Sequence, residues 1–279
     1  MTLKIGAVAI LEEDKLPVLF ENVAFFGMKT CQLINWNPDL YEKDFDGLVA
    51  KVKERMAATG VTPSALWAGY SGRLFWNFTE GPVTLGIVPP AHRWHRVQEL
   101  KRGADFAAAC GLKAIITHCG FLPENITDPE FKPVAMAILE VAEYCKKLGI
   151  EFWFETGQET PIALLRYIET VGTDNLGINL DPANLLLYGK GNPIDALDVF
   201  GKYVRNIHVK DGILPVDGYK LGEETQVGKG KVDFPRFVKK LLSIGFDGEF
   251  IIEREIPEGE EQRRDIMETV DNLNKWANA

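Results

Sequence analysis

Residues 150–181 read IEFWFETGQETPIALLRYIETVGTDNLGINLD, and this stretch decides the fold. It opens and closes on short apolar runs, Ile150–Glu155 and Asn175–Asp181, which have the length of β-strands. Between them Pro161–Val171 has the apolar spacing of a helix, with Pro161 at its start and Gly172 just past its end. Strand, helix and strand in this order predict a parallel β–α–β unit.

The same alternation runs along the whole chain. We expect strands at Leu3–Ile10, Met28–Ile34, Thr62–Trp67, Lys113–His118, Ile150–Glu155, Asn175–Asp181, Tyr203–His208 and Gly248–Glu253. We expect helices at Pro17–Gly27, Phe45–Thr59, Arg93–Cys110, Pro129–Leu148, Pro161–Val171, Pro193–Lys202, Phe234–Ile244 and Gln262–Ala277. Eight strands alternating with eight helices predict an α/β fold, a single (β/α)₈ TIM barrel that forms one domain over residues 1–279. An open doubly wound sheet is the alternative, but no glycine-rich nucleotide fingerprint follows any strand.

Composition and charge indicate which kinds of molecule the chain is expected not to bind. The chain has 279 residues, of which 46% are hydrophobic and 25% charged, and its formal net charge is −9. An acidic chain disfavours nucleic acid as a partner, because phosphate binding needs a basic face. No apolar run approaches the roughly 20 residues of a membrane span, and the first ten residues do not read as a signal peptide. Together with four cysteines that show no paired spacing, this predicts a cytoplasmic protein without a membrane partner.

Four strand-like segments of the second half end on side chains that bind metals. The terminal residues are Glu155, Asp181, His208 and Glu253. Side chains alternate along a strand, so each can point inward at the carboxyl end of its barrel strand, where four neighbouring strand ends can surround one ion. Three carboxylates and one imidazole suit a single divalent ion, with Mn²⁺ favoured and Mg²⁺, Co²⁺ or Zn²⁺ as alternatives. Four protein ligands also leave positions where substrate oxygens could bind.

Each of these residues has a plainer interpretation when it is taken alone. Asp181 precedes Pro182 and could cap the helix that follows, and a lone histidine is more often structural than a ligand. Glu255 has the same inward parity as Glu253, so a shift of two residues would exchange them. The hypothesis of a metal site therefore rests on the four positions together.

Further candidates surround the same mouth of the barrel. The long loops Ala68–Pro90 and Lys210–Val232 follow strands, at the face where barrel active sites form. His118 closes the fourth strand, and we favour a contact with substrate over a second metal. Lys210 could polarise a substrate oxygen or remain solvated, and Gln158 could hydrogen-bond a sugar hydroxyl. Aromatic side chains could form an apolar platform for a sugar, although core packing is the alternative, notably for Trp67; they are Trp36, Trp67 and Trp76.

The segments that carry these residues resemble the xylose isomerase-like TIM-barrel superfamily. They are Phe154–Thr160, Asn179–Asn184, Ile207–Asp211, Gly228–Phe234, Gly245–Gly248 and Ile251–Glu253. The resemblance implies that the residues at 155, 181, 208 and 253 bind one divalent metal and that Glu155 and Glu253 also move protons. It is greatest to the sugar isomerases and epimerases, some of which act on sugar phosphates. Many ketose 3-epimerases have a histidine three residues after the metal-binding aspartate, where this chain has Asn184, a candidate contact for substrate.

The expected activity is that of a metal-dependent sugar isomerase or epimerase of carbohydrate metabolism. A proton next to a carbonyl would be transferred through a metal-bound enediolate, with Glu155 and Glu253 as the acid/base pair. The substrate would be a small sugar or keto-polyol, and a homo-oligomer is left open by analogy with the family. An inosose-type dehydratase, which is a lyase, could use the same site. An abasic-site endonuclease fits less well because the chain is acidic and has four histidines, and a sugar-binding barrel without catalysis is a further alternative.

Overall fold

The computed structural model describes residues 2–278, so the two ends of the predicted domain, residues 1 and 279, lie outside it. Eight parallel strands close into a barrel in the order β1-β10-β7-β6-β5-β4-β3-β2. The barrel strands are β1 (Lys4–Ile10), β2 (Thr30–Asn35), β3 (Thr62–Ala68), β4 (Ala114–Thr117), β5 (Glu151–Glu155), β6 (Leu176–Leu180), β7 (Val204–Val209) and β10 (Glu249–Ile252). Closure is made where β1 pairs with β10, with Lys4 opposite Glu249 and Ala7 opposite Ile252. The predicted TIM barrel is confirmed.

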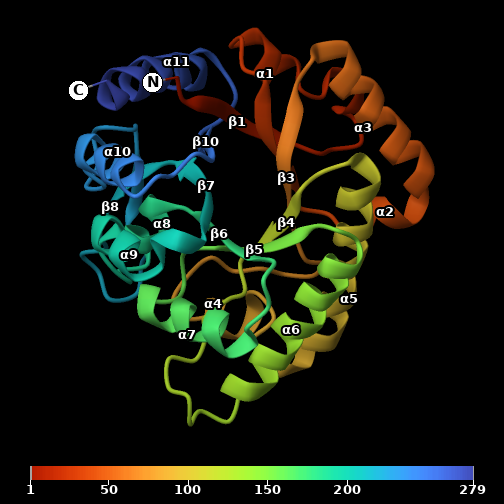
Figure 1. Ribbon diagram of the computed structural model, residues 1–279, viewed down its shortest axis with the longest axis vertical. Coiled ribbons are helices and arrows are strands. Elements are labelled where there is room, and N and C mark those ends of the chain that lie inside the picture. The colour runs from red at the N-terminus through yellow and green to blue at the C-terminus, as the bar shows by residue number, and fades with distance from the viewer. Residues whose placement is uncertain (1, 279) are drawn as a thin grey trace.

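Helices surround the barrel as an outer layer (Figure 1). The principal ones are α1 (Glu21–Phe25), α3 (Phe45–Thr59), α5 (Pro90–Cys110), α6 (Phe131–Lys147), α7 (Pro161–Val171), α9 (Pro193–Phe200), α10 (Phe234–Ser243) and α11 (Glu260–Ala277). Local sequence explains their ends. Helix α7 begins where the Thr160 side chain accepts a hydrogen bond from the Ala163 N–H, and it ends at Gly172, whose φ of 68° is left-handed.

Short elements fill several connections. They are the 3₁₀ turns η1 (Leu16–Val18) and η2 (Gly201–Tyr203), the helices α2 (Leu40–Lys43), α4 (Gly81–Thr84) and α8 (Pro182–Leu187), and the hairpin strands β8 (Asp211–Ile213) and β9 (Glu223–Thr225). The helix predicted at 17–27 is shorter than expected, because Phe20 has a φ of 74° and separates η1 from α1. The segments from 68 to 90 and from 210 to 232 are loops; the first contains α4, and the second contains β8 and β9.

The main core lies between the barrel and the helices, and a second apolar cluster fills the barrel itself. The inner cluster consists of Ile34, Ala65, Trp67, Ala114, Ile116 and Trp153, with Val8 packed against it. On the side formed by β6 and β7, buried polar side chains replace the apolar ones. Within the described part of the chain, no helix combines the length and hydrophobicity of a membrane span.

Candidate metal and active site

Four acidic and imidazole side chains meet at the carboxyl end of the barrel. Glu155 is the last residue of β5, His208 lies in β7, and Asp181 and Glu253 directly follow β6 and β10. All four are buried, with exposed fractions between 0% and 8%. One ligand atom from each residue lies within 4.8 Å of the corresponding atoms of the others. The structure thus brings together the four residues that the strand ends predicted.

The donor atoms are oriented toward a shared centre. His208 Nδ1 is 2.9 Å from Glu155 Oε1 and 3.0 Å from Glu253 Oε2, yet it makes no hydrogen bond of acceptable geometry. Asp181 Oδ2 is also buried without a hydrogen bond, 3.8 Å from the same nitrogen. Buried polar atoms without partners are costly in a folded protein. A divalent cation among them would satisfy all of these atoms, so the residues fit the ion that the resemblance implies.

Asp181 caps a helix and also contributes an oxygen to the cluster, so it fits both roles that its sequence context left open. Its Oδ1 accepts a hydrogen bond from the Asn184 N–H and caps α8 at 2.9 Å. Its Oδ2 has no hydrogen-bond partner and belongs to the cluster. Helix capping therefore fixes the rotamer of the carboxylate and leaves one oxygen free for a ligand role.

A buried amide network supports the cluster from inside the barrel, and the sequence analysis gave it no role. Its hydrogen bonds join His208 Nε2 to Gln32 Oε1 at 2.7 Å, Gln32 Nε2 to Asn179 Oδ1 at 3.3 Å and Asn206 Nδ2 to Asn179 Oδ1 at 2.6 Å. Asn179 Nδ2 then donates to Glu155 Oε2. With Nε2–H donating to Gln32, Nδ1 faces the cluster. In the metal-free protein the charges of Glu155 and Glu253 outweigh burial and raise the pKa of His208 well above its usual range, so a bound cation would replace the Nδ1 proton and leave the tautomer that a metal ligand requires. A glutamine between two apolar residues of a strand, Cys31 and Leu33, was the signal that could have found it.

Lys210 makes the two glutamates different. Its buried Nζ lies 3.4 Å from Glu253 Oε2 and 3.7 Å from Asp181 Oδ2. Burial alone would raise the pKa of Glu253, but Lys210 and His208 outweigh it and hold that pKa well below its usual range. Burial raises the pKa of Glu155 to about 7 in the metal-free protein, against the opposing charge of His208. Two carboxylates with pKa values driven apart are the usual basis of an acid/base pair.

Glu255 lies outside the cluster. Its side chain is 53% exposed, and its Oε1 is 3.1 Å from Lys210 Nζ, on the solvent side of the lysine. Glu253, by contrast, has its carboxylate at the centre of the site. The alternative register in which Glu255 replaces Glu253 is therefore not the one adopted.

A cavity of about 230 Å³ opens beside the cluster, with Glu155, Glu253, Asn184 and Lys210 in its lining. Aromatic rings form the opposite wall: Trp36 and Trp67 lie 4.4 Å apart between centroids, and the Trp76 ring is 5.1 Å from that of His118. Trp67 is 3% exposed, so it serves both the inner core and the cavity wall. Burial lowers the pKa of His118 to about 3, so its imidazole is neutral there.

The remaining predicted contact, Gln158, does not line this cavity. It is 1% exposed, and neither amide atom has a hydrogen-bond partner of good geometry. It lies close enough to His118 and Tyr188 to shift the pKa of both side chains. The neighbouring Glu159, which the sequence analysis passed over, is also buried, and burial raises its pKa to about 8.

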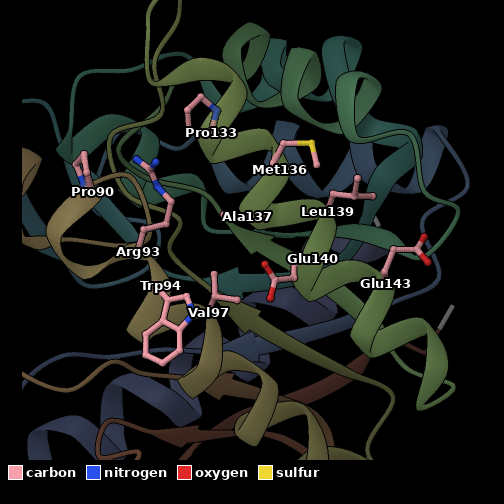
Figure 2. Close-up of a pocket in the computed structure, with 10 residues that line it drawn as sticks. All are labelled: Pro90, Arg93, Trp94, Val97, Pro133, Met136, Ala137, Leu139, Glu140 and Glu143. Atoms are coloured by element: carbon pink, nitrogen blue, oxygen red, sulfur yellow. The ribbon is translucent and has the colours of Figure 1, made fainter.

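A second hollow, on the outer helix layer, lies far from the cluster in the fold. It has a volume of about 560 Å³ and lies between α5 and α6 (Figure 2), with Trp94 74% exposed and Met136 62% exposed. Its titratable residues are Arg93, Glu140 and Glu143. Because it is not at the strand ends and has no convergent donor atoms, we do not place chemistry there.

Comparison with known proteins agrees with this fold. The family described as xylose isomerase-like TIM barrel matches residues 20–276. A solved structure titled xylose isomerase domain protein, from Planctomyces limnophilus, is 30% identical, with a TM-score of 0.87 and coverage of 98% of this chain and 96% of the other. A D-tagatose 3-epimerase-like protein has a TM-score of 0.74 over 99% and 98% of the two chains, but at 19% identity it shows the fold alone.

Among curated proteins, inosose dehydratase from Lacticaseibacillus casei is 25% identical over 183 residues. That alignment covers 54% of this chain and 60% of the dehydratase. The chain spans between half and three fifths of the length of the first curated relatives that it matches.

Proposed function

Because the chain belongs to the xylose isomerase-like TIM-barrel family, we propose that it is a divalent-metal-dependent sugar isomerase or epimerase. The observation that carries the proposal is the convergence of four buried donor atoms, two of them without hydrogen-bond partners, beside a cavity of sugar-binding character. Glu155, Asp181, His208 and Glu253 would hold the ion, with Mn²⁺ favoured over Mg²⁺, Co²⁺ and Zn²⁺. When bound, a divalent ion supplies Lewis-acid stabilisation of the negative charge that develops on a carbonyl oxygen.

The chemical step belongs to the two glutamates. Glu253, which the adjacent Lys210 ammonium keeps ionised, removes the proton from the carbon next to the carbonyl. The electron pair of the broken C–H bond forms a carbon–carbon double bond while the π pair of the carbonyl moves onto its oxygen, and the result is an enediolate. Glu155, whose pKa burial raises toward neutrality, returns a proton. Return to the opposite face of the same carbon gives the epimer, and return to the neighbouring carbon gives aldose–ketose isomerisation.

Other side chains position the substrate. The neutral His118 can hydrogen-bond a hydroxyl without adding charge, and Lys210 can donate to a substrate oxygen from the cavity lining. Asn184 faces the same cavity with an amide, and Gln158 lies close to His118 without lining the cavity. The tryptophan wall would cover the apolar C–H face of a sugar ring.

A dehydratase is the second candidate, favoured by the likeness to inosose dehydratase. It would use the same first step, after which a β-hydroxyl leaves with a proton as water instead of a proton returning to carbon. The sites for the two reactions would differ in how the leaving hydroxyl is protonated, and the Lys210 ammonium is the candidate for that role, because His118 is neutral.

Incubation in D₂O tests the proposal and separates the candidates. The Mn²⁺-loaded protein is mixed with a panel of ketoses, keto-inositols, ring-oxidised glycosides and hydroxypyruvate, and the products are followed by NMR. Deuterium at the α-carbon with unchanged mass balance supports isomerisation or epimerisation, whereas loss of water supports dehydration. Glu155→Gln and Glu253→Gln should each lower the rate by a factor of 10² or more. Exchange that is absent in the wild type, or unchanged in both variants, would refute the proposal.

A further inference from the structure

A second and larger cavity adjoins the candidate active site. It has a volume of about 640 Å³ and shares Ile34, Trp36, Glu253 and Glu255 with the cavity at the cluster. It leads outward between the connection that follows β1 and the connection that follows β10. Figure 1 shows the two helices that flank this region, α1 and α11, next to β1.

Two helices of unequal length flank this space. Helix α1 has five residues, whereas α11, on the other side, has 18. The walls of the cavity are largely apolar, with Val8, Ile10, Leu19 and Phe20 on one side and Trp36 at the junction with the active site. Trp36 is 41% exposed, although it packs on Trp67. An apolar group could cover the indole there.

The charges of the lining disfavour a phosphate. Lys15 already pairs with Glu12 and Glu258, at 2.9 Å and 3.1 Å. Arg254 pairs with Glu224 and Asp265, at 2.7 Å and 3.0 Å. Arg263 lies over the Phe25 ring, 5.4 Å from its centroid. Glu253, Glu255, Glu258 and Glu260 also line the cavity, so an added anion would face like charge.

From these features we infer that the second cavity binds an apolar group attached to the reacting sugar, so that the substrate is a glycoside with a neutral aglycone. The inference rests on the proposed function, which places the sugar ring at the cluster. The inner cavity alone is smaller than the roughly 300–1,000 Å³ of typical ligand sites, and the two cavities together fall within that range. Because a glycosidic bond blocks the anomeric carbon, the carbonyl that activates the proton would be an oxidised carbon of the ring.

Binding of unreactive probes tests the inference without turnover. Isothermal titration calorimetry would compare methyl β-D-glucopyranoside, phenyl β-D-glucopyranoside and glucose 6-phosphate on the wild-type protein. Burial of the phenyl ring should make the phenyl glycoside bind at least tenfold more tightly than the methyl glycoside. Glucose 6-phosphate should bind more weakly than the phenyl glycoside. Equal affinities of the two glycosides, tightest binding of the phosphate, or no binding of either glycoside at millimolar concentration would overturn the inference.

Variants that fill the second cavity test whether the phenyl group binds there. Val18 lines it and is 58% exposed, so Val18→Trp should fill the space without unfolding the protein. We expect this variant to bind the phenyl glycoside no more tightly than the methyl glycoside, and to keep the wild-type affinity for the methyl glycoside. Asn22→Trp, from the same lining, is the second filling variant. Met136→Trp, on the outer face of α6, is the matched control and should change neither affinity. A phenyl advantage that survives both filling variants would contradict the assignment.

The binding test of the second cavity and the exchange test of the proposed function can fail independently of each other. A phenyl advantage with no solvent exchange on any keto sugar would support the cavity and reject the chemistry. Exchange on free ketoses together with equal binding of the two glycosides would support the chemistry and reject the cavity.

Discussion

His208 Nε2 lies 2.7 Å from Gln32 Oε1, although 176 residues separate them in the sequence. Replacing Gln32 with Met keeps the length of the side chain and removes the acceptor that fixes the imidazole tautomer. We expect Mn²⁺ affinity to fall about 10–100-fold, as for other partners that orient metal ligands. Calorimetric titration with MnCl₂ measures this directly.

The matched control for Gln32 is Asn175, a buried amide that donates to Ala142 O and Ile150 O away from the cluster. Asn175→Leu should lower the free energy of unfolding and leave Mn²⁺ affinity unchanged. Wild-type affinity in Gln32→Met would show that the hydrogen bond has no part in metal binding.

Metal removal should lower the melting temperature. A ligand at 100 times its Kd stabilises the folded state by about 2.7 kcal/mol, because it binds the folded state and not the unfolded one. Scanning calorimetry with excess EDTA and then with excess MnCl₂ measures the shift. In His208→Ala the two scans should coincide, and an undiminished shift in this variant would place the bound ion elsewhere.

Glu159 should make the stability of the metal-free protein depend on pH. Burial raises the pKa of its folded-state carboxyl to about 8 from an ordinary 4.5, so the folded state retains a proton that the unfolded chain releases between these values. This contribution to stability is complete below pH 4.5 and is lost as the pH rises through about 8. Glu159→Gln, which needs no proton, should therefore gain stability relative to the wild type between pH 5.5 and 8.5.

Urea unfolding in EDTA at both pH values measures the Glu159 effect, and Glu169→Gln, an exposed residue of α7, is the control. If the difference between Glu159→Gln and the wild type were the same at pH 5.5 and 8.5, the raised pKa would be disproved.

Asp211 ties the loop after β7 to the barrel. Its carboxylate accepts hydrogen bonds from the N–H groups of Gly212, Gly228, Gly230 and Val232, at 2.8–3.1 Å. Hydrogen bonds to a buried charge are worth about 1.5–3 kcal/mol each, so loss of the four in Asp211→Ala should lower the free energy of unfolding by at least about 3 kcal/mol. The loop should also become sensitive to limited proteolysis.

Gly230→Ala is an independent probe of the same contact, because a Cβ there would lie 2.2 Å from Asp211 Oδ1. It should also destabilise the loop. Asp217→Ala, which removes one hydrogen bond to Tyr219 N in an exposed turn, should change stability by at most about 0.5 kcal/mol. A rigid, protease-resistant loop in Asp211→Ala would contradict this role.

The sequence predicted the barrel because helix signals and strand periodicity are local. The bounds of α7 follow from Thr160, Pro161 and Gly172, which act within one turn of the helix ends. The helix expected at 17–27 was too long, because the left-handed conformation of Phe20 depends on packing that the local pattern does not encode. The larger cavity could not be predicted from the sequence either, because its lining comes from the connections after β1 and β10, which lie at opposite ends of the chain.

The cluster could be predicted because each of its residues closes a strand, and strand ends meet at one mouth of a barrel. The amide network could not, because Gln32, Asn179 and Asn206 come from three strands and their pairing depends on register across the barrel. The sequence also could not predict that Glu155 and Glu253 have different surroundings. They arise from where Lys210 Nζ comes to lie, next to Glu253, and a flexible side chain leaves that open in the sequence.

The central claim is that Glu155, Asp181, His208 and Glu253 hold one divalent ion. Anomalous diffraction at the manganese edge, from crystals grown with MnCl₂, tests it most directly. The account predicts one strong anomalous peak within bonding distance of all four side chains, and its loss in His208→Ala. A map with no peak at these residues, or a peak bound elsewhere with the four side chains unchanged, would contradict it.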